Sequence, residues 1–570
     1  MIRAIGLLLL VALLAGCIAN SSSSGSDDND NPPPAQGIQI APAEATVAAG
    51  ATQQFTATAD DGSDVTWQVN GVPGGNGELG TISAAGLYTA PPLPPPGGSV
   101  TIKAISRADT SLTGRASARI RYSNASLHGA YVFSWRGTVA GGPFGAIGRF
   151  EADGDGGIDA GNEDANLPDG VVLNVPFNGS YEIDADGTGQ AVFVSSRSSV
   201  ELRFVIGAGG RAEVIRVDAG AAAAGAIVPQ TDASLQTIAG DYVFRLDGTG
   251  ETGVRAGVVG RFTADDDGAV GAGIEDRNTG GAVARAVEFT GAYDLGDDGH
   301  GSLTLTSALG VSHYAFYAVS AEEMYLLRID RANPLTGSAL AQADADFADG
   351  DLSGDYVFYL LGDDGLNTIA TAGLFNAGGD GNIGDAIFDR NDRGTVQQEN
   401  AFTGVYAIDD SGRGAATFFS SGGRTELAFY MQSADHAVVL EADSAAVRSG
   451  EFIGQPGDDF TTAALDGAFT LASAGVENPL VGRLVFNGDG DIDDGVEVES
   501  AAGGTPQAIA LDGSYTMEAA GRGALTLLTE GGGQQDYIIY VIDPTRVLLL
   551  GGGPGAIPLA WLRQQWPPAE

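Results

Sequence analysis

The segment Gly129-Ala130-Tyr131-Val132-Phe133 decides the fold, because it recurs three more times along the chain. The later copies are Gly240-Asp241-Tyr242-Val243-Phe244, Gly354-Asp355-Tyr356-Val357-Phe358 and Gly467-Ala468-Phe469, with their first aromatic residues 111, 114 and 113 positions apart. A period of this length is too long for one turn of a solenoid and suits an independent domain. The sequence therefore predicts four related domains.

A second landmark follows in each copy: Phe177-Asn178-Gly179-Ser180-Tyr181, Phe289-Thr290-Gly291-Ala292-Tyr293, Phe402-Thr403-Gly404-Val405-Tyr406 and Leu511-Asp512-Gly513-Ser514-Tyr515. Within the first copy, apolar residues alternate at Tyr131, Phe133 and Trp135, which is the period of a half-buried strand. Turns such as Asp186-Gly187 join the apolar runs as hairpins. Seven or eight antiparallel strands per copy suit a small up-and-down barrel or a sandwich, and the succession of hairpins favours the barrel.

The region before the repeats, residues 37–122, also shows strand alternation, for example in Val65-Thr66-Trp67-Gln68-Val69. Short strands around one tryptophan suit a β-sandwich. The segments Thr66–Asn70, Gly80–Ser83 and Gly86–Pro91 resemble bacterial Ig-like domains. The resemblance implies a spacer or adhesion module, so the predicted fold class is all-β: an Ig-like sandwich followed by four small antiparallel β-barrels or sandwiches.

Cys17 is the single cysteine of the chain and follows Leu14-Ala15-Gly16. Arg3 and the apolar run from Ile5 to Leu14 precede it, which is the pattern of a signal peptide too short to span a bilayer. Small residues before a cysteine resemble the lipobox of bacterial lipoproteins, and the resemblance implies that Cys17 becomes the lipidated N-terminus. In Gram-negative lipoproteins an aspartate after the cysteine signals inner-membrane retention, so Ile18 implies the outer membrane.

These features give the predicted domain boundaries. The signal peptide covers residues 1–16, a lipidated and disordered tether 17–36, and the Ig-like unit 37–122. The four β repeats cover 123–232, 233–345, 346–455 and 456–570. The repeats resemble a pattern of predicted bacterial surface proteins, which implies no particular activity.

The formal net charge is −45, with 73 acidic and 28 basic residues. Such an acidic surface repels phosphate backbones, so a nucleic-acid partner is excluded. It also disfavours binding to anionic lipid by charge, so we expect the lipid on Cys17 to be the membrane contact. We expect a monomer with an unknown protein or glycan partner.

Acidic turns recur between strands: Asp153-Gly154-Asp155, Asp265-Asp266-Asp267, Asp380-Gly381-Asn382 and Asn487-Gly488-Asp489-Gly490-Asp491. Calcium binds clustered carboxylates, but these turns lack the glycine and glutamate spacing of an EF-hand. Aspartate and glycine also form ordinary hairpin turns, which is the favoured interpretation, with calcium as the alternative. We therefore predict no metal and no cofactor.

Further carboxylates recur as Glu163-Asp164, Glu275-Asp276, Phe388-Asp389 and Glu497-Val498-Glu499. Paired carboxylates serve glycoside hydrolysis, but these drift between copies, so we expect solvated strand ends. Aspartates also recur 37 residues after the landmark tyrosines, at Asp218, Asp330 and Asp443, with Gly552 in the fourth copy. We attribute that spacing to the shared fold, and ligand contact at a barrel mouth is the alternative.

The four histidines, His128, His300, His313 and His436, occupy non-equivalent positions. A metal or catalytic site shared by the repeats would keep them in register, so we expect exposed, incidental histidines. No Gly-x-Ser-x-Gly nucleophile motif is present. We therefore predict no catalytic residue and no enzymatic activity.

Two functions follow from the sequence. The first is a lipid-anchored structural, adhesive or interaction module of the cell envelope, on either face of the outer membrane. The second is a lipid- or glycan-binding protein that uses the interior or mouth of the repeated barrels, since eight-stranded barrels can be filled or hollow.

Overall fold

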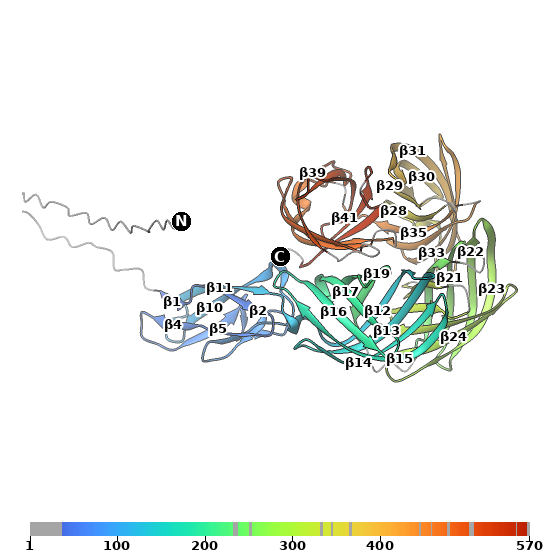
Figure 1. The fold of residues 1–570 in the computed structure, drawn as a ribbon. Helices are drawn as coiled ribbons and strands as arrows, with labels where there is room; N and C mark the ends of the chain where they lie inside the picture. Colours follow the sequence, from blue (N-terminus) through green and yellow to red (C-terminus); the bar gives the residue numbers. More distant parts are fainter. Residues whose placement is uncertain are drawn as a thin grey trace, which may run out of the picture.

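The computed structural model describes residues 37–231, 237–249, 254–330, 334–343, 346–363, 368–443, 446–457, 459–475, 479–500, 507–554 and 556–566. Cys17, the signal peptide and the tether lie outside the described residues, so lipidation stays a prediction. The described chain forms small N-terminal sheets followed by four closed barrels (Figure 1). The all-β prediction is confirmed, and the repeats are barrels.

The N-terminal module is built from short strands in three sheets, ordered β1-β4, β2-β11-β10-β5-β6 and β3-β9-β8-β7. Trp67 and Ile102 of the five-stranded sheet and Tyr88 of the four-stranded sheet belong to one hydrophobic core. Its resemblance to Ig-like domains stays a prediction. The elements are β1(Ile38–Ala41), β2(Glu44–Ala48), β3(Thr52–Gln54), β4(Thr56–Ala59), β5(Val65–Val69), β6(Val72–Pro73), β7(Gly75–Asn76), β8(Gly80–Ile82), β9(Leu87–Thr89), η1(Pro96–Gly98), β10(Ser99–Ser106), β11(Thr113–Arg121) and η2(Asn124–Ser126).

Each barrel contains eight antiparallel strands in chain order and is closed by pairing of its first and eighth strands. Barrel 1 consists of β12(His128–Val139), β13(Gly142–Asp153), β14(Gly157–Leu167), β15(Gly170–Ile183), β16(Thr188–Ser195), β17(Ser199–Ile206), η3(Ala208–Gly210), β18(Ala212–Arg216) and β19(Ala222–Pro229). Barrel 2 consists of β20(Gly240–Thr249), β21(Arg255–Ala264), β22(Ala269–Thr279), β23(Ala282–Leu295), β24(His300–Ser307), β25(Gly310–Ala318), β26(Glu323–Arg328) and β27(Leu335–Ala341).

The second pair of barrels has the same order. Barrel 3 consists of η4(Asp349–Asp351), β28(Ser353–Asp363), β29(Thr368–Gly378), β30(Asn382–Asp392), β31(Thr395–Ile408), β32(Arg413–Ser420), β33(Gly423–Ser433), β34(His436–Glu441) and β35(Val447–Gly454). Barrel 4 consists of η5(Thr462–Ala464), β36(Asp466–Ser473), β37(Leu480–Asn487), β38(Asp491–Glu499), β39(Ala508–Met517), β40(Arg522–Thr529), β41(Gln534–Asp543), β42(Arg546–Gly551) and β43(Leu559–Gln564).

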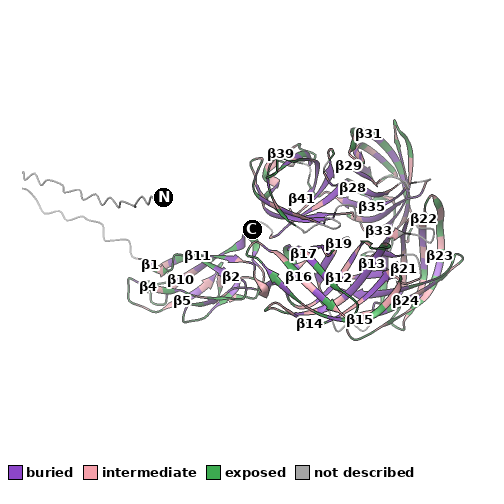
Figure 2. Cartoon of the chain, in the orientation of Figure 1, coloured by how far each residue is buried: buried purple, intermediate pink, exposed green. Residues whose placement is uncertain are grey.

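The barrel interiors are packed with side chains. In barrel 1, the rings of Phe133 and Trp135 stack with centroids 4.0 Å apart, and those of Phe177 and Phe193 with centroids 4.7 Å apart. Equivalent apolar clusters fill the other three barrels, and Figure 2 shows buried residues along the strands of the barrels. The barrels are therefore packed cores of the kind that eight strands can fill.

The second sequence landmark has a structural role. The Tyr181 hydroxyl donates to the carbonyl oxygen of Leu127, at 2.6 Å, and so fixes the segment that leads into barrel 1. Tyr406 and Tyr515 bind the carbonyls of Leu352 and Leu465 in the same way. These leucines are fully buried and close one end of each core.

The four barrels form a ring. The first strands of each barrel pack on the last strands of the next: β12 and β13 on β25–β27, β20 and β21 on β33 and β34, β28 and β29 on β41 and β42, and β36 and β37 on β17 and β18. The last contact joins barrel 4 to barrel 1 and completes the ring seen in Figure 1. Head-to-tail contacts form a closed ring when the rotation between units allows it.

A glutamine after the eighth strand joins each barrel to the next. Nε2 of Gln230 donates to the carbonyls of Asp298 and Ala318 in barrel 2, at 3.0 and 2.8 Å. The corresponding donors are Gln342 to Ser411 and Met431, Gln455 to Ala520 and Val541, and Gln565 to Asp186 and Ile206. All four junctions therefore share one hydrogen-bond pattern.

Three junctions carry an additional buried carboxylate. Asp276 lies at a bulge between β22 and β23, accepts two bonds from the Arg413 guanidinium at 2.9 Å and one from the Tyr430 hydroxyl at 2.6 Å. Asp389 binds Arg522 and Tyr540 in the same way, and Asp164 binds His300 at 2.7 Å. Bulges re-aim side chains, and here they turn the aspartate towards the next barrel.

At the fourth junction, Val498 stands at the position of the bulge aspartate, opposite Val481 on the neighbouring strand. As at the other junctions, apolar residues form a cluster: Val205, Ile215 and Val217 of barrel 1 pack on Ala472 and Val481 of barrel 4. The N-terminal module also lies at this junction: the Tyr122 hydroxyl donates to the carbonyl of Gln565, and its ring lies 5.9 Å from that of Trp566.

Within the described residues, no helix is long and apolar enough to cross a membrane.

Replacing Asp276 with alanine should destabilise the ring. Asp276 is fully buried, and its loss leaves Arg413 and the Tyr430 hydroxyl without their acceptor. Breaking one partner of a buried pair costs about 3–5 kcal/mol. Denaturant unfolding of the variant should show this loss, whereas Asp266→Ala in an exposed turn should stay within about 0.5 kcal/mol of the parent. Equal effects of the two substitutions would contradict the role given to Asp276.

Candidate functional site

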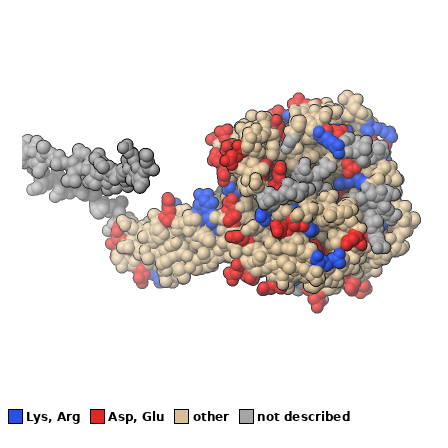
Figure 3. Space-filling model, viewed as in Figure 1, with Lys and Arg blue, Asp and Glu red and all other residues tan. Residues whose placement is uncertain are grey.

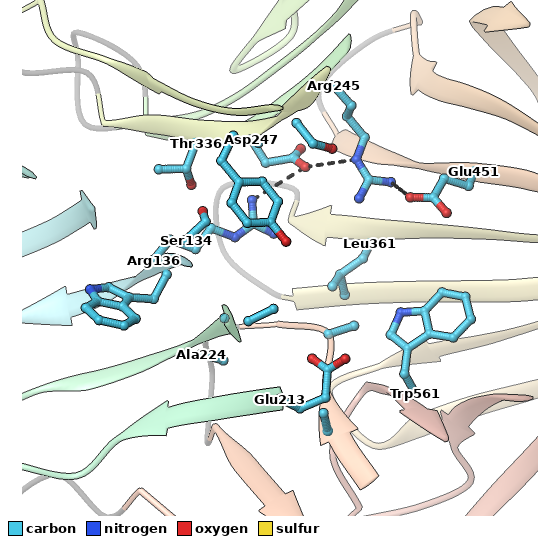
Figure 4. Close-up of a pocket in the computed structure, with 18 of the residues that line it drawn as sticks. Ser134, Arg136, Glu213, Ala224, Arg245, Asp247, Thr336, Leu361, Glu451 and Trp561 are labelled. Carbon is cyan, nitrogen blue, oxygen red and sulfur yellow. Dashed lines mark ion pairs between the residues drawn. The ribbon is translucent and has the colours of Figure 1, made fainter. Parts of the chain in front are cut away.

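The main candidate site is a cavity of about 380 Å³ where the four barrels meet (Figure 4). Its lining comes from the first and eighth strands of all four barrels, with residues at or next to the seventh strand in barrels 1, 2 and 3. The ring therefore creates the cavity, which no single barrel contains. We call it the axial pocket.

One side of the axial pocket is an arginine cluster around Asp247. The Asp247 carboxylate is 6% exposed and lies 3.5 Å from both Arg136 and Arg245 and 3.8 Å from Arg255. The hydroxyl of Ser449 also donates to it. Burial alone would raise the pKa of Asp247, but the arginines and this hydrogen bond lower it. Asp247 therefore remains ionised inside the ring.

Arg245 links this cluster to barrel 3. Its guanidinium lies 3.0 Å from Glu451 and donates to the Tyr359 hydroxyl at 2.8 Å. His436 lies 3.4 Å from Glu451 on the other side. Burial opposes ionisation of Glu451, but Arg245 and His436 hold its pKa well below the usual range.

On the opposite side of the axial pocket, the arginines and carboxylates are not paired one to one. Glu213 accepts a 2.8 Å hydrogen bond from Arg211 and lies 3.4 Å from Arg563, so two guanidinium groups share one carboxylate. The Arg563 group lies 4.9 Å above the Trp561 ring. Glu323 also lines the pocket, and no other described residue forms a hydrogen bond or ion pair with its side chain. Burial raises the pKa of Glu323, although Arg211 and Arg563 oppose the effect.

The charges that line the axial pocket are balanced. Arg136, Arg211, Arg245 and Arg563 face Glu213, Asp247, Glu323 and Glu451. The chain as a whole has a net charge of −45, and acidic groups are scattered over the face shown in Figure 3. The axial pocket is thus a locally neutral, highly polar environment within an acidic protein.

The acidic turns behave as hairpin turns. Oδ1 of Asp153 accepts from the backbone N–H groups of Asp155, Gly156 and Gly157 at 2.7–2.9 Å, and these bonds lower its pKa. Asp265, Asp380 and Asn487 accept bonds within their own turns in the same way. Within the described ranges, no group of three or more His, Cys, Asp or Glu residues is arranged to hold a metal ion.

The expectation of solvated carboxylate pairs at strand ends was wrong. Asp164, Asp276 and Asp389 are fully buried between barrels, because the bulge turns each of them outward into a junction. The glutamates beside them point inward: Glu275 lies 2.5 Å from Arg277, and burial raises the pKa of Glu163 to about 7. These acids belong to the packing of the ring.

The strand-end aspartates bind neighbours in their own barrels. Asp218 pairs with Arg216, Asp330 with Arg328, and Asp443 accepts from the backbone of Glu426. The expectation of exposed, incidental histidines is wrong for two of the four. His300 binds Asp164 across a junction, and His436 lines the axial pocket.

Sequence reasoning missed the axial pocket because its lining is not repeated. The position five residues after the first landmark aromatic is Arg136, Asp247, Leu361 or Ala474 in the four barrels. The junction glutamines did carry a signal, since Gln230, Gln342, Gln455 and Gln565 recur 112, 113 and 110 residues apart.

Comparison with known proteins leaves the family open. No protein-family model and no curated protein matches the chain. Among solved structures, the transferrin-binding protein B of Neisseria meningitidis serogroup B is 10% identical, with 62% of this chain and 83% of that chain covered and a TM-score of 0.17. The transferrin-binding protein B of Haemophilus parasuis Hp5 is also 10% identical, with 64% and 83% covered and a TM-score of 0.18.

A buried glutamate in barrel 4 should make stability depend on pH. Glu497 is fully buried, with Gln535 as its hydrogen-bond donor, and burial raises its pKa from 4.5 to about 7. Because the unfolded chain ionises at lower pH, the stability from this group is present below about pH 4.5 and is lost as the pH rises to about 7. The loss amounts to about 3 kcal/mol.

The measurement is the free energy of unfolding at pH 5 and pH 8. The side chain of Glu497→Gln cannot ionise. The free energy of unfolding of this variant should therefore fall less than that of the parent when the pH is raised from 5 to 8. Glu530→Gln, at an exposed position, should follow the parent at both. A parallel pH dependence of the parent and Glu497→Gln would contradict the assignment.

Proposed function

We propose that this protein is a lipid-anchored, non-catalytic interaction module of the bacterial cell envelope. The observation that carries the proposal is the closed ring: its barrel interiors are filled, so contacts with large partners must use the outer surface. The lipobox-like segment ending at Cys17 supports attachment to a membrane. The N-terminal module, at one junction of the ring, would connect the anchor to the barrels.

The outer surface offers candidate contact positions. Val194, Phe419 and Leu528 lie on the fifth strands of barrels 1, 3 and 4 and are 47%, 47% and 48% exposed. They occupy the same position, 13 residues after the landmark tyrosine of each barrel. A repeated apolar position on a ring suits a partner that is engaged at several points, so that weak contacts combine. The partner would be a protein or a glycan.

The filled interiors do not support the alternative in which each barrel encloses a lipid or glycan. A hollow barrel would need space where Phe133, Phe150 and Phe193 lie in mutual contact.

Attachment can be tested by replacing Cys17 with serine in a Gram-negative host. The parent protein should partition with membranes and incorporate an alkyne-labelled fatty acid, because the thiol receives the lipid. Cys17→Ser should lose both properties, whereas Ser23→Ala in the same segment should keep them. Retention of the label by Cys17→Ser would refute lipidation at this residue.

Surface display can be tested with proteinase K on intact cells that express the parent protein. Cleavage should remove the barrels from cells while a periplasmic marker stays intact. Complete protection on intact cells, combined with cleavage after outer-membrane permeabilisation, would place the ring on the periplasmic face instead.

A further inference from the structure

The axial pocket contains two oppositely charged groups without adequate partners. Nε of Arg563 is buried and has no hydrogen-bond partner, and its nearest carboxylate, Glu213, is shared with Arg211. The partly buried side chain of Glu323 forms no hydrogen bond or ion pair with the described residues. Buried polar groups are normally satisfied, so the unpartnered Nε of Arg563 calls for an explanation, and the carboxylate of Glu323 beside it is a charge that no protein group pairs with.

The surroundings of these groups define what could satisfy them. Arg211 and Arg563 both keep 34% of their side-chain surface exposed, so guanidinium N–H groups remain accessible to a bound molecule. The charges of these two arginines also act on Glu323, which places the three side chains within electrostatic reach of one another. One molecule in the cavity could therefore contact both the arginines and Glu323.

Size and charge narrow the class of molecule. The cavity of about 380 Å³ is within the range of small-molecule sites. Four arginines and four carboxylates line it, so a ligand with a single net charge would leave an opposite charge unbalanced on burial. A molecule that carries one positive and one negative group matches the zero net charge of the lining. It could also bind both Arg563 and Glu323.

We propose that the axial pocket binds a small zwitterion of the α-amino-acid class, with the ligand carboxylate on Arg563 and Arg211 and the ligand ammonium on Glu323. Arginine suits the carboxylate because its planar donors pair with two oxygens at once. The remaining polar groups around the cavity, such as Tyr325, would contact the ligand side chain. This site is independent of the proposed envelope function, since it does not require the lipid or the outer surface.

Isothermal titration of the full chain with the twenty standard amino acids tests the proposal directly. We expect at least one amino acid to bind with one-to-one stoichiometry. Acetate and methylammonium, which each carry one of the two charges, should bind at least about tenfold more weakly, because each satisfies one pole alone. Absence of binding for all twenty amino acids up to about 10 mM, or equal binding of acetate, would overturn the proposal.

Substitutions locate the site. Glu323→Gln and Arg563→Gln should each weaken binding at least about tenfold, whereas Glu322→Gln, at the exposed neighbouring position, should bind like the parent. Thermal melting of each variant checks that the ring is intact, and Glu323→Gln should melt close to the parent because the Glu323 side chain has no hydrogen bond or ion pair to lose. Unchanged binding by a folded Glu323→Gln would show that the ammonium pole is misassigned and would overturn the proposal.

Discussion

The ring depends on one hydrogen-bond arrangement: a side-chain amide that donates to two backbone carbonyls of the next barrel. Gln230 and its three counterparts use the same atom and equivalent acceptors at all four junctions. A neutral amide satisfies buried carbonyls without the desolvation cost of a charge. The same glutamine contact thus recurs at each of the four junctions, including the one between barrel 4 and barrel 1 that closes the ring.

The polar groups of the ring have different roles at the junctions and around the axial pocket. At the junctions, bulge aspartates such as Asp276 are bound by arginine and tyrosine at short distances, so their charges are satisfied within the protein. Around the axis, the equivalent first-strand positions differ between barrels, and Glu323 and Arg563 are left without full partners. The repeated residues thus build the ring, and the residues that differ between repeats give the axial pocket its chemistry.

The sequence predicted the repeats, the strands and the barrels because those features depend on alternation and turn chemistry within about 110 residues. It also contained an unused signal for the ring. Runs such as Tyr537–Ile542 are apolar at every position, which indicates a strand buried on both faces. Asp164 could not be placed from the sequence, because a single bulge decides whether such a residue faces solvent or a neighbouring barrel. The axial pocket could not be predicted either, since it exists only after four distant segments have met.

The closing contact of the ring has consequences for the order of folding. Gln565 binds the carbonyl of Asp186 across a sequence separation of 379 residues, whereas the other three glutamines bind partners fewer than 100 residues away. During synthesis, the face of barrel 1 that contacts barrel 4 therefore stays uncovered until barrel 4 has been made. The apolar surface of Val205, Ile215 and Val217 is uncovered during that interval. Folding of this chain thus includes a period in which an apolar face of barrel 1 is exposed to solvent, and such a face is prone to aggregation until barrel 4 covers it.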